Sequence, residues 1–109
     1  MRTLFKTSTF NDYYSTLSAQ VQEKIEYVIN ILIQHKVVNS KFVKKLENTD
    51  YYELRISADN EYRFILFAMD HPNIIEATQV VLLNGFIKKS SKDYKKQIET
   101  AERLLHLLK

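Results

Sequence analysis

Only one glycine (Gly85) and one proline (Pro72) occur in the 109 residues of this chain. These two residue types most often interrupt helices and strands and form tight turns. A chain with so few of them is expected to consist mainly of regular elements joined by short connections. The single glycine also excludes a glycine-rich loop that holds a phosphate group with backbone N–H groups.

The first third of the chain has the spacing of helices. A short strand is expected at residues 2–7, followed by a short helix that Ser8 or Thr9 caps and that ends near Leu17. Ser18 can cap a second helix, whose apolar side chains recur every three or four residues at Val21, Ile25, Val28, Ile29 and Leu32. Because almost nothing separates them, the two helices are expected to form a helical hairpin.

The middle of the chain alternates between two sets of side chains, as strands do. A first strand is predicted with Tyr52, Leu54 and Ile56 on one face and Tyr51, Glu53 and Arg55 on the other. A second strand is expected at residues 61–69, with Tyr62, Phe64 and Leu66 opposite Arg63, Ile65 and Phe67. A third strand is predicted at about 75–83, where Asn84-Gly85 ends it. Sequential strands with short turns favour an antiparallel meander.

The last segment again has helical spacing. Ser91 is expected to cap a helix whose core face holds Tyr94, Ile98, Ala101, Leu105 and Leu108, widened by Leu104 and Leu107. The order of elements is strand–helix–helix–strand–strand–strand–helix. This order predicts a single α+β domain over residues 1–109, a small antiparallel sheet with an N-terminal helical hairpin and a C-terminal helix packed on one side.

Several function classes are excluded by residues that the chain lacks. It has no cysteine, which removes disulfides and thiolate chemistry and fits a reducing cytoplasm. Its start has no apolar run typical of a signal peptide, and no stretch approaches the ~20 apolar residues that span a membrane. His35, His71 and His106 have no metal-ligand spacing. We therefore expect a cytoplasmic protein with no metal, no cofactor and no membrane partner.

The positive charges are more informative than their net excess of +3. If the first two strands of the meander pair around their short turn, Arg55 and Arg63 come nearly opposite each other. Like charges in that position are unfavourable unless an anion lies between them. Glu53 could be that anion, which would make a surface ion-pair cluster, and a bound phosphate is the alternative.

A second basic cluster lies where the strands lead into the last helix, at Lys88, Lys89, Lys92, Lys95 and Lys96. Cations at a helix N-terminus oppose the helix dipole, which suggests phosphate binding, although a solvated lysine face has the same pattern. Lys45 is one of the cations that precede the strands. Tyr51 and Tyr62 are the aromatic residues that could stack on RNA bases, whereas Tyr52 is expected in the core.

Three motifs in this order resemble the RelE/ParE superfamily of toxin–antitoxin toxins, and most of all its HigB-like, phage-derived branch. They are Tyr52-Glu53-Leu54-Arg55, Tyr62-Arg63 and Leu83-Asn84-Gly85-Phe86-Ile87-Lys88-Lys89. The resemblance extends over residues 45–101. It implies a RelE-like fold and a ribosome-dependent endoribonuclease that cuts mRNA without a metal. It also implies a cognate antitoxin as partner, expected to be a helix-turn-helix protein.

The resemblance further implies roles for individual residues. The RNA 2′-OH would attack the adjacent phosphate, which Arg55 and Arg63 would grip. Lys88 and Lys89 would stabilise charge or orient the messenger, and Glu53 and Tyr62 would act as acid–base or orienting groups. The RNA itself would be bound by Tyr51, Lys45, Lys92, Lys95 and Lys96.

The chain departs from the family at Asn84, where relatives often have histidine. Asparagine transfers no proton at neutral pH, so a lysine, Tyr62 or Tyr94 would have to do so, or turnover is slow. Two other readings remain open at this point. One is a ParE-like toxin that poisons a topoisomerase, and the other is a non-catalytic basic module that binds RNA or the ribosome.

Overall fold

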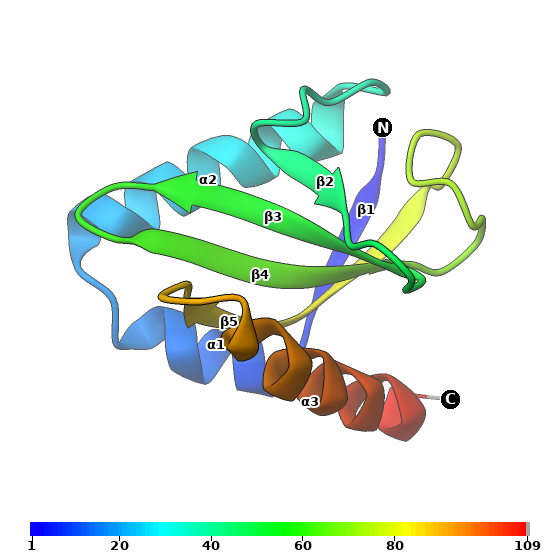
Figure 1. Ribbon diagram of the computed structural model, residues 1–109. Helices are drawn as coiled ribbons and strands as arrows, with labels where there is room; N and C mark the ends of the chain where they lie inside the picture. Colours follow the sequence, from blue (N-terminus) through cyan, green and yellow to red (C-terminus); the bar gives the residue numbers. More distant parts are fainter. Residues whose placement is uncertain (109) are drawn as a thin grey trace.

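The computed structural model describes residues 1–108 and places a five-stranded sheet at the centre of the molecule (Figure 1). The elements in chain order are β1 (Thr3–Lys6), α1 (Ser8–Ser15), α2 (Ala19–Gln34), β2 (Val43–Lys45), β3 (Tyr51–Ser57), β4 (Glu61–Ala68), β5 (Gln79–Ile87) and α3 (Lys92–Leu108). The expected α+β class is confirmed, and the expected order of helices and strands holds except for β2, which the sequence did not predict. Within residues 1–108, no helix combines the length and apolarity that a membrane span requires.

The sheet has the strand order β1-β5-β4-β3-β2. β3, β4 and β5 form the predicted antiparallel meander, and β2 adds a short antiparallel strand at one edge. At the other edge, β1 pairs with β5 in parallel. The sheet is therefore mixed, and the expectation of a purely antiparallel sheet was wrong in this detail.

The helices cover both faces of the sheet, not one as expected. α1 and α2 pack on the face that carries Leu54 and Phe64, and α3 packs on the face that carries Ile65 and Leu83 (Figure 1). The physical reason lies in the strands, because both alternating sets of β4 and β5 contain large apolar residues. A sheet that is apolar on both faces needs cover on both.

Local hydrogen bonds set the helix ends. Ser18 caps α2 as predicted, because its hydroxyl accepts the Val21 N–H at 3.3 Å. The cap of α1 is Thr7 rather than Ser8 or Thr9, since its hydroxyl accepts the Phe10 N–H at 3.0 Å. Before α3, the Asp93 carboxylate accepts backbone N–H bonds from residues 89 and 90, at the position where Ser91 was expected to cap. α3 buries Ala101 and Leu105, whereas the predicted core residue Leu108 is 53% exposed.

The third strand of the meander lies four residues further along the chain than predicted. β5 runs through Asn84 and Gly85 instead of ending there. Gly85 is opposite Phe64, and a Cβ atom on it would lie 2.3 Å from Cδ1 of that ring. This glycine therefore makes room for a buried aromatic ring and does not form a turn.

Asp70 joins the two ends of the connection between β4 and β5 by hydrogen bonds. Its carboxylate accepts bonds from the Thr78 hydroxyl and from the backbone N–H groups of Thr78 and Gln79, the last at 2.9 Å. The hydrogen bond from the Thr78 side chain and then the backbone bond from Gln79 lower the pKa of Asp70 from 3.8 to about 2. The ionised carboxylate is therefore the form that the folded chain binds best.

We expect this carboxylate to contribute to acid stability. Its folded pKa lies below its usual value, so its contribution is complete above about pH 4 and is lost as the pH falls toward 2. A carbon-detected NMR titration of the Asp70 carboxyl should therefore have its midpoint near pH 2. Between pH 4 and 2, Asp70→Asn should lose less stability than the wild type, whereas Asp12→Asn on α1 should follow the wild-type slope. Equal slopes for all three proteins would contradict the prediction.

Candidate functional site

Glu53 is the centre of a polar cluster on the α3 face of the sheet. It lies on β3, and Arg63 on β4 approaches it diagonally, with Nε 3.0 Å from Glu53 Oε1. The Tyr94 hydroxyl on α3 donates to the same oxygen at 2.7 Å. The side chains of Arg63 and Glu53 are only 3% and 7% exposed, so the carboxylate is held between a cation and a phenol with little water around it.

Arg63 is held from several sides. Its Nη1 donates to the Tyr62 carbonyl at 3.0 Å, and its Nη2 lies 3.3 Å from a carboxylate oxygen of Glu61. The planar guanidinium thus bridges two carboxylates and a backbone oxygen from inside the protein. In this arrangement Arg63 fixes the position of Glu53 and is covered by its partners.

Tyr94 brings the first turn of α3 onto the sheet. Its ring meets Phe86 edge-on at 5.3 Å between centroids, and the Lys88 ammonium lies 5.9 Å from its centroid. Burial first, and then the hydrogen bond and charge of Glu53, raise the pKa of Tyr94 to about 12, although Arg63 acts in the opposite direction. At neutral pH the phenol therefore keeps its proton and acts as a donor.

A pocket of about 400 Å³ opens beside this cluster. It is lined by side chains from β2, β3, α3 and the residue before α3, including Lys44, Lys45, Glu53, Ser91 and Tyr94. The register places Lys44 directly beside Glu53 on the neighbouring strand. The pocket thus combines two carboxylates, those of Glu47 and Glu53, with a phenol and two ammonium groups. Among residues 1–108, no cluster of three or more His, Asp or Glu side chains is arranged to hold a metal ion.

The structure separates the residues that the sequence singled out. Arg55 is opposite Arg63 in the register, as predicted, but its guanidinium is directed to the Ser40 carbonyl at 3.5 Å and lines another pocket. Tyr62 lies on the opposite face, buried in the core under α1 and α2, with its hydroxyl donating to Asp59 at 3.0 Å. Tyr51 is also buried, with its ring 5.8 Å from that of Phe67.

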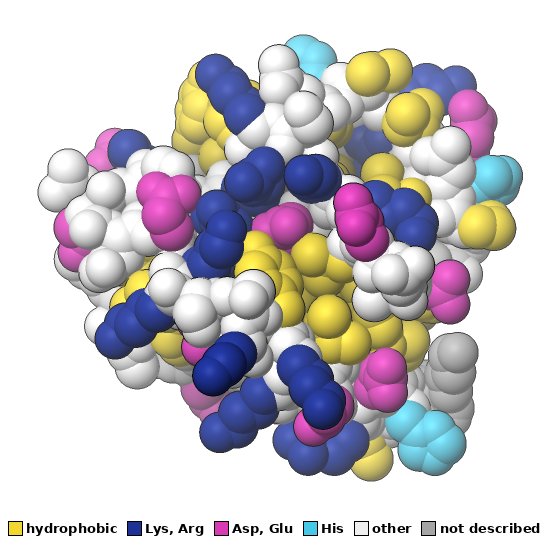
Figure 2. All heavy atoms as spheres, viewed as in Figure 1, with side chains coloured by type: hydrophobic (Ala, Val, Ile, Leu, Met, Phe, Trp, Pro, Cys, Tyr) yellow, Lys and Arg dark blue, Asp and Glu magenta, His cyan; other side chains and the backbone are white. Residues whose placement is uncertain are grey.

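The predicted lysines lie at the surface around the cluster. All are exposed, and they lie just after β5 and in the first turns of α3: Lys88, Lys89, Lys92, Lys95 and Lys96. Lys45 is exposed on β2 and donates to the Thr49 carbonyl. On this face of the molecule, Figure 2 shows Lys and Arg side chains gathered around a patch of apolar side chains.

Three polar residues of the pocket were absent from the predicted site, namely Lys44, Glu47 and Ser91, and Tyr94 was predicted only as a substitute proton donor. β2 has three residues, too few for alternation to reveal it. The available signal was the pair Lys44-Lys45 just before the Glu53 strand. Asn84, which marked the departure from the family, is buried and donates its side-chain amide to Gln97 of α3 at 2.9 Å. It therefore joins β5 to α3 through a partly buried hydrogen bond.

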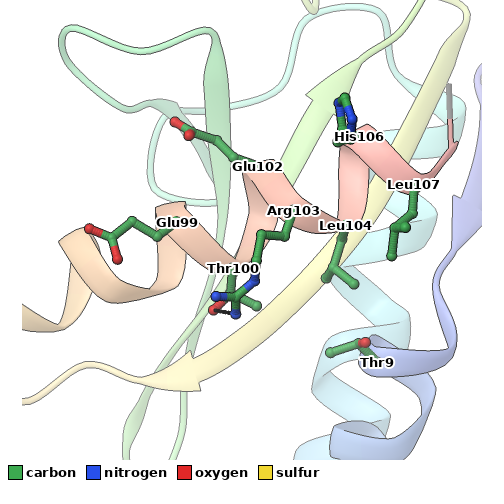
Figure 3. A pocket seen from close by; sticks show the side chains of 8 residues that line it. All are labelled: Thr9, Glu99, Thr100, Glu102, Arg103, Leu104, His106 and Leu107. Carbon is green, nitrogen blue, oxygen red and sulfur yellow. Dashed lines mark hydrogen bonds between the residues drawn. The ribbon is translucent and has the colours of Figure 1, made fainter.

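A larger pocket lies elsewhere on the molecule, and its lining forms no comparable cluster around a buried carboxylate. It has a volume of about 940 Å³ and lies between the beginning of α1 and the second half of α3. Figure 3 shows Leu104 and Leu107 directed toward Thr9, while Glu99 and Glu102 point away. Size alone therefore does not mark the candidate site, and the convergent polar groups do.

Comparisons with known proteins identify the family and the fold of this chain. Residues 12–106 match the family model described as phage derived protein Gp49-like (DUF891). No curated protein sequence matches the chain.

Solved structures of the RelE toxin from E. coli have the same fold. A mutant of RelE in the free state is 14% identical with a TM-score of 0.65, and the match covers 90% of this chain and 95% of that one. A chain of the intact E. coli RelBE toxin–antitoxin complex is 14% identical with a TM-score of 0.63, and the match covers 83% of this chain and 100% of that one. The isolated RelE toxin is 15% identical with a TM-score of 0.63, covering 91% and 97%. The chain therefore belongs to the Gp49-like family of phage-derived proteins and has the RelE toxin fold.

Proposed function

We propose that this protein is the toxin of a type II toxin–antitoxin system and cuts mRNA on the ribosome without a metal. The observation that carries the proposal is the Glu53 carboxylate, held by Arg63 and Tyr94 at a pocket that also contains Lys44 and Lys45. RNA supplies its own nucleophile, the 2′-OH, so the protein needs a proton acceptor, a proton donor and cations near the phosphate. This pocket offers all three.

The groups of the pocket can be given roles in that reaction. Glu53 takes the proton from the 2′-OH of the RNA, and the 2′ oxygen then forms a bond to the adjacent phosphorus. Lys44 and Lys45 stabilise the negative charge on the phosphate oxygens as the P–O5′ bond breaks. Tyr94, protonated because its pKa is about 12, gives its proton to the leaving O5′. The products are a 2′,3′-cyclic phosphate and a 5′-OH, and the proton on Glu53 returns to Tyr94.

Roles of the other predicted residues follow from where they lie. Arg63, being covered, acts in this proposal by positioning Glu53 rather than by gripping the phosphate. Lys88 and Lys89, with the lysines of the first turns of α3, orient the messenger at the rim of the pocket. Tyr62 has no role in the chemistry, because its ring and hydroxyl are on the other side of the sheet.

We further propose a cytoplasmic protein that is silenced by an antitoxin encoded beside it. The likeness to RelE as found in the RelBE complex supports a partner of that kind. A helix-turn-helix antitoxin is the form that the resemblance to the HigB-like branch implies. Copurification of the protein with the product of the neighbouring gene, with loss of its activity, tests this pairing.

A second candidate function is favoured by the burial of Arg63. A guanidinium that is 3% exposed and ion-paired with two carboxylates of its own chain supports a protein that binds RNA on the ribosome through its lysines and does not cut it. Both functions stop translation, but only one produces new RNA ends. The two are therefore separable in a single experiment.

The test is to add purified protein to a translating extract and map the 5′ ends of the mRNA. We expect new 5′-OH ends within the ribosome-bound region, and about 100-fold slower cutting by Tyr94→Phe, which removes only the hydroxyl. Tyr14→Phe on α1 is the matched control and should cut like the wild type. Translation arrest without new ends would favour the binding module. Full activity of Tyr94→Phe would remove Tyr94 from the mechanism.

A further inference from the structure

We propose that a second pocket, between α2, the segment before β2 and the end of β3, binds one nucleotide of single-stranded RNA beside the candidate cleavage site. The pocket has a volume of about 340 Å³. Its lining includes three cations, Lys24, Lys41 and Arg55, and two aromatic residues, Tyr27 and Phe42. This proposal concerns binding alone, but its choice of RNA as ligand rests on the proposed function.

The cations of this pocket form no ion pair among the described residues, although Glu61 lies within electrostatic reach of Arg55. Among residues 1–108, the ion pairs include none that involves Lys24, Lys41 or Arg55. The lining residues of the pocket include no acidic residue. Other surface lysines near α2 are paired, since Lys6 lies 3.8 Å from Glu26 and Lys36 lies 3.5 Å from Glu76.

The hydrogen bonds in and around the pocket leave room for an anion. Lys24 donates to the Ser57 carbonyl at 2.7 Å, which holds its ammonium at the pocket without neutralising it. Glu61, next to Arg55 across the strand pair, is already bonded by Ser57 at 2.8 Å and by Arg63 at 3.3 Å. Three like charges directed at one concave surface repel each other, and a phosphate between them relieves that repulsion.

The aromatic residues favour a nucleic acid over a free phosphate. Tyr27 is 64% exposed on α2, so one side of its ring is available for stacking. Phe42 is half-buried, and the Lys41 ammonium lies 4.9 Å from its ring centroid. Below them, buried Val28 and Ile56 form an apolar floor. Cations beside an open aromatic ring are the combination by which proteins hold unpaired nucleotides.

The position of the pocket suits a strand that also enters the candidate cleavage site. Lys41 and Phe42 line the second pocket, and Lys44 and Lys45 line the first. Three residues of extended chain span at most about 10 Å, so the two pockets are neighbours on either side of β2. Arg55, expected from the sequence to grip the scissile phosphate, would instead bind a phosphate of a neighbouring nucleotide.

The test measures the affinity of the full chain for a hexameric single-stranded RNA with 2′-O-methyl groups, which cannot be cut by 2′-OH attack. We expect Tyr27→Ala to weaken binding about 5- to 50-fold, because one stacked base is lost. Lys41→Gln should weaken binding and lower the slope of log affinity against log salt by about 0.7. Lys36→Gln, which removes an equal charge at the far end of α2, should change affinity less than twofold.

The outcomes separate this proposal from the cleavage proposal. Wild-type affinity in both Tyr27→Ala and Lys41→Gln overturns the nucleotide pocket, even if the protein cuts mRNA. An effect of Lys36→Gln equal to that of Lys41→Gln also overturns it, because only general charge would then matter. A ten-glutamate peptide that binds as tightly as the RNA and depends on Lys41 would assign the pocket to an acidic protein partner instead. Tyr27-dependent binding of the uncut RNA by a protein that cuts nothing would support the pocket and defeat the cleavage proposal.

Discussion

Replacing Arg63 with alanine is expected to slow RNA cleavage by about 100- to 1000-fold and to destabilise the fold by about 3 kcal/mol. Both effects have one origin. Arg63 is the cation that lies 3.0 Å from the buried Glu53 carboxylate, and its loss leaves that charge with the Tyr94 hydroxyl and the exposed Lys44 of the neighbouring strand. A buried carboxylate without its cation is costly, and a displaced one no longer reaches the 2′-OH in the required geometry.

Arg63→Lys distinguishes loss of charge from loss of position. Lysine restores a positive charge near Glu53 but lacks the planar guanidinium that also bonds Glu61 and the Tyr62 carbonyl. We expect it to recover most of the folding free energy in urea denaturation, while cleavage stays about 10-fold or more below the wild type.

Arg103→Ala on the exposed side of α3 is the control for removing an arginine, and it should match the wild type in both measurements. Cleavage by Arg63→Ala within threefold of the wild-type rate would show that Arg63 is dispensable. Full recovery of cleavage in Arg63→Lys would show that charge alone suffices.

Much of the candidate site followed from simple alternation along the strands. Glu53 and Arg63 were predicted on neighbouring strands, and the register across the turn placed Arg55 opposite Arg63, as the structure has it. The same rule argued against Tyr62, because a residue adjacent to Arg63 points to the other face of the sheet. Its position on the Phe64 face was therefore readable from the sequence.

The rest of the site depends on contacts between distant segments. Tyr94 donates to Glu53, which lies 41 positions earlier in the chain. This contact depends on the angle at which α3 packs on the sheet, and no local sequence pattern predicts that angle. Lys44 enters the pocket from a three-residue strand that only the sheet stabilises. The misplaced boundary of β5 has the same cause, because the space that Gly85 provides is needed by Phe64, a partner on another strand.

Arg2 has a structural role that the sequence analysis did not predict. It is 6% exposed, and its guanidinium donates to five backbone carbonyls, two of them at 2.7 Å (Leu32) and 2.9 Å (Ile74). The others belong to residues 35, 36 and 75. Burial lowers the pKa of Arg2 from 12.5, but an arginine stays charged at any pH at which the protein folds. One side chain thus joins the N-terminus, the end of α2 and the connection between β4 and β5.

We expect Arg2→Met to destabilise the protein by about 3 kcal/mol, which lowers the melting temperature by roughly 15 °C for a domain of this size. Methionine fills similar space but leaves the carbonyls at the end of α2 without donors and removes a cation from the negative end of that helix dipole. The melting temperature of Arg2→Lys should lie between those of Arg2→Met and the wild type. One ammonium group cannot reach both the end of α2 and the connection between β4 and β5. Arg103 is exposed, so the melting temperature of the control variant Arg103→Met should lie within about 2 °C of the wild type. A melting temperature for Arg2→Met equal to that of Arg103→Met would mean that water replaces the guanidinium at no cost, and that the end of α2 is held by its apolar contacts alone.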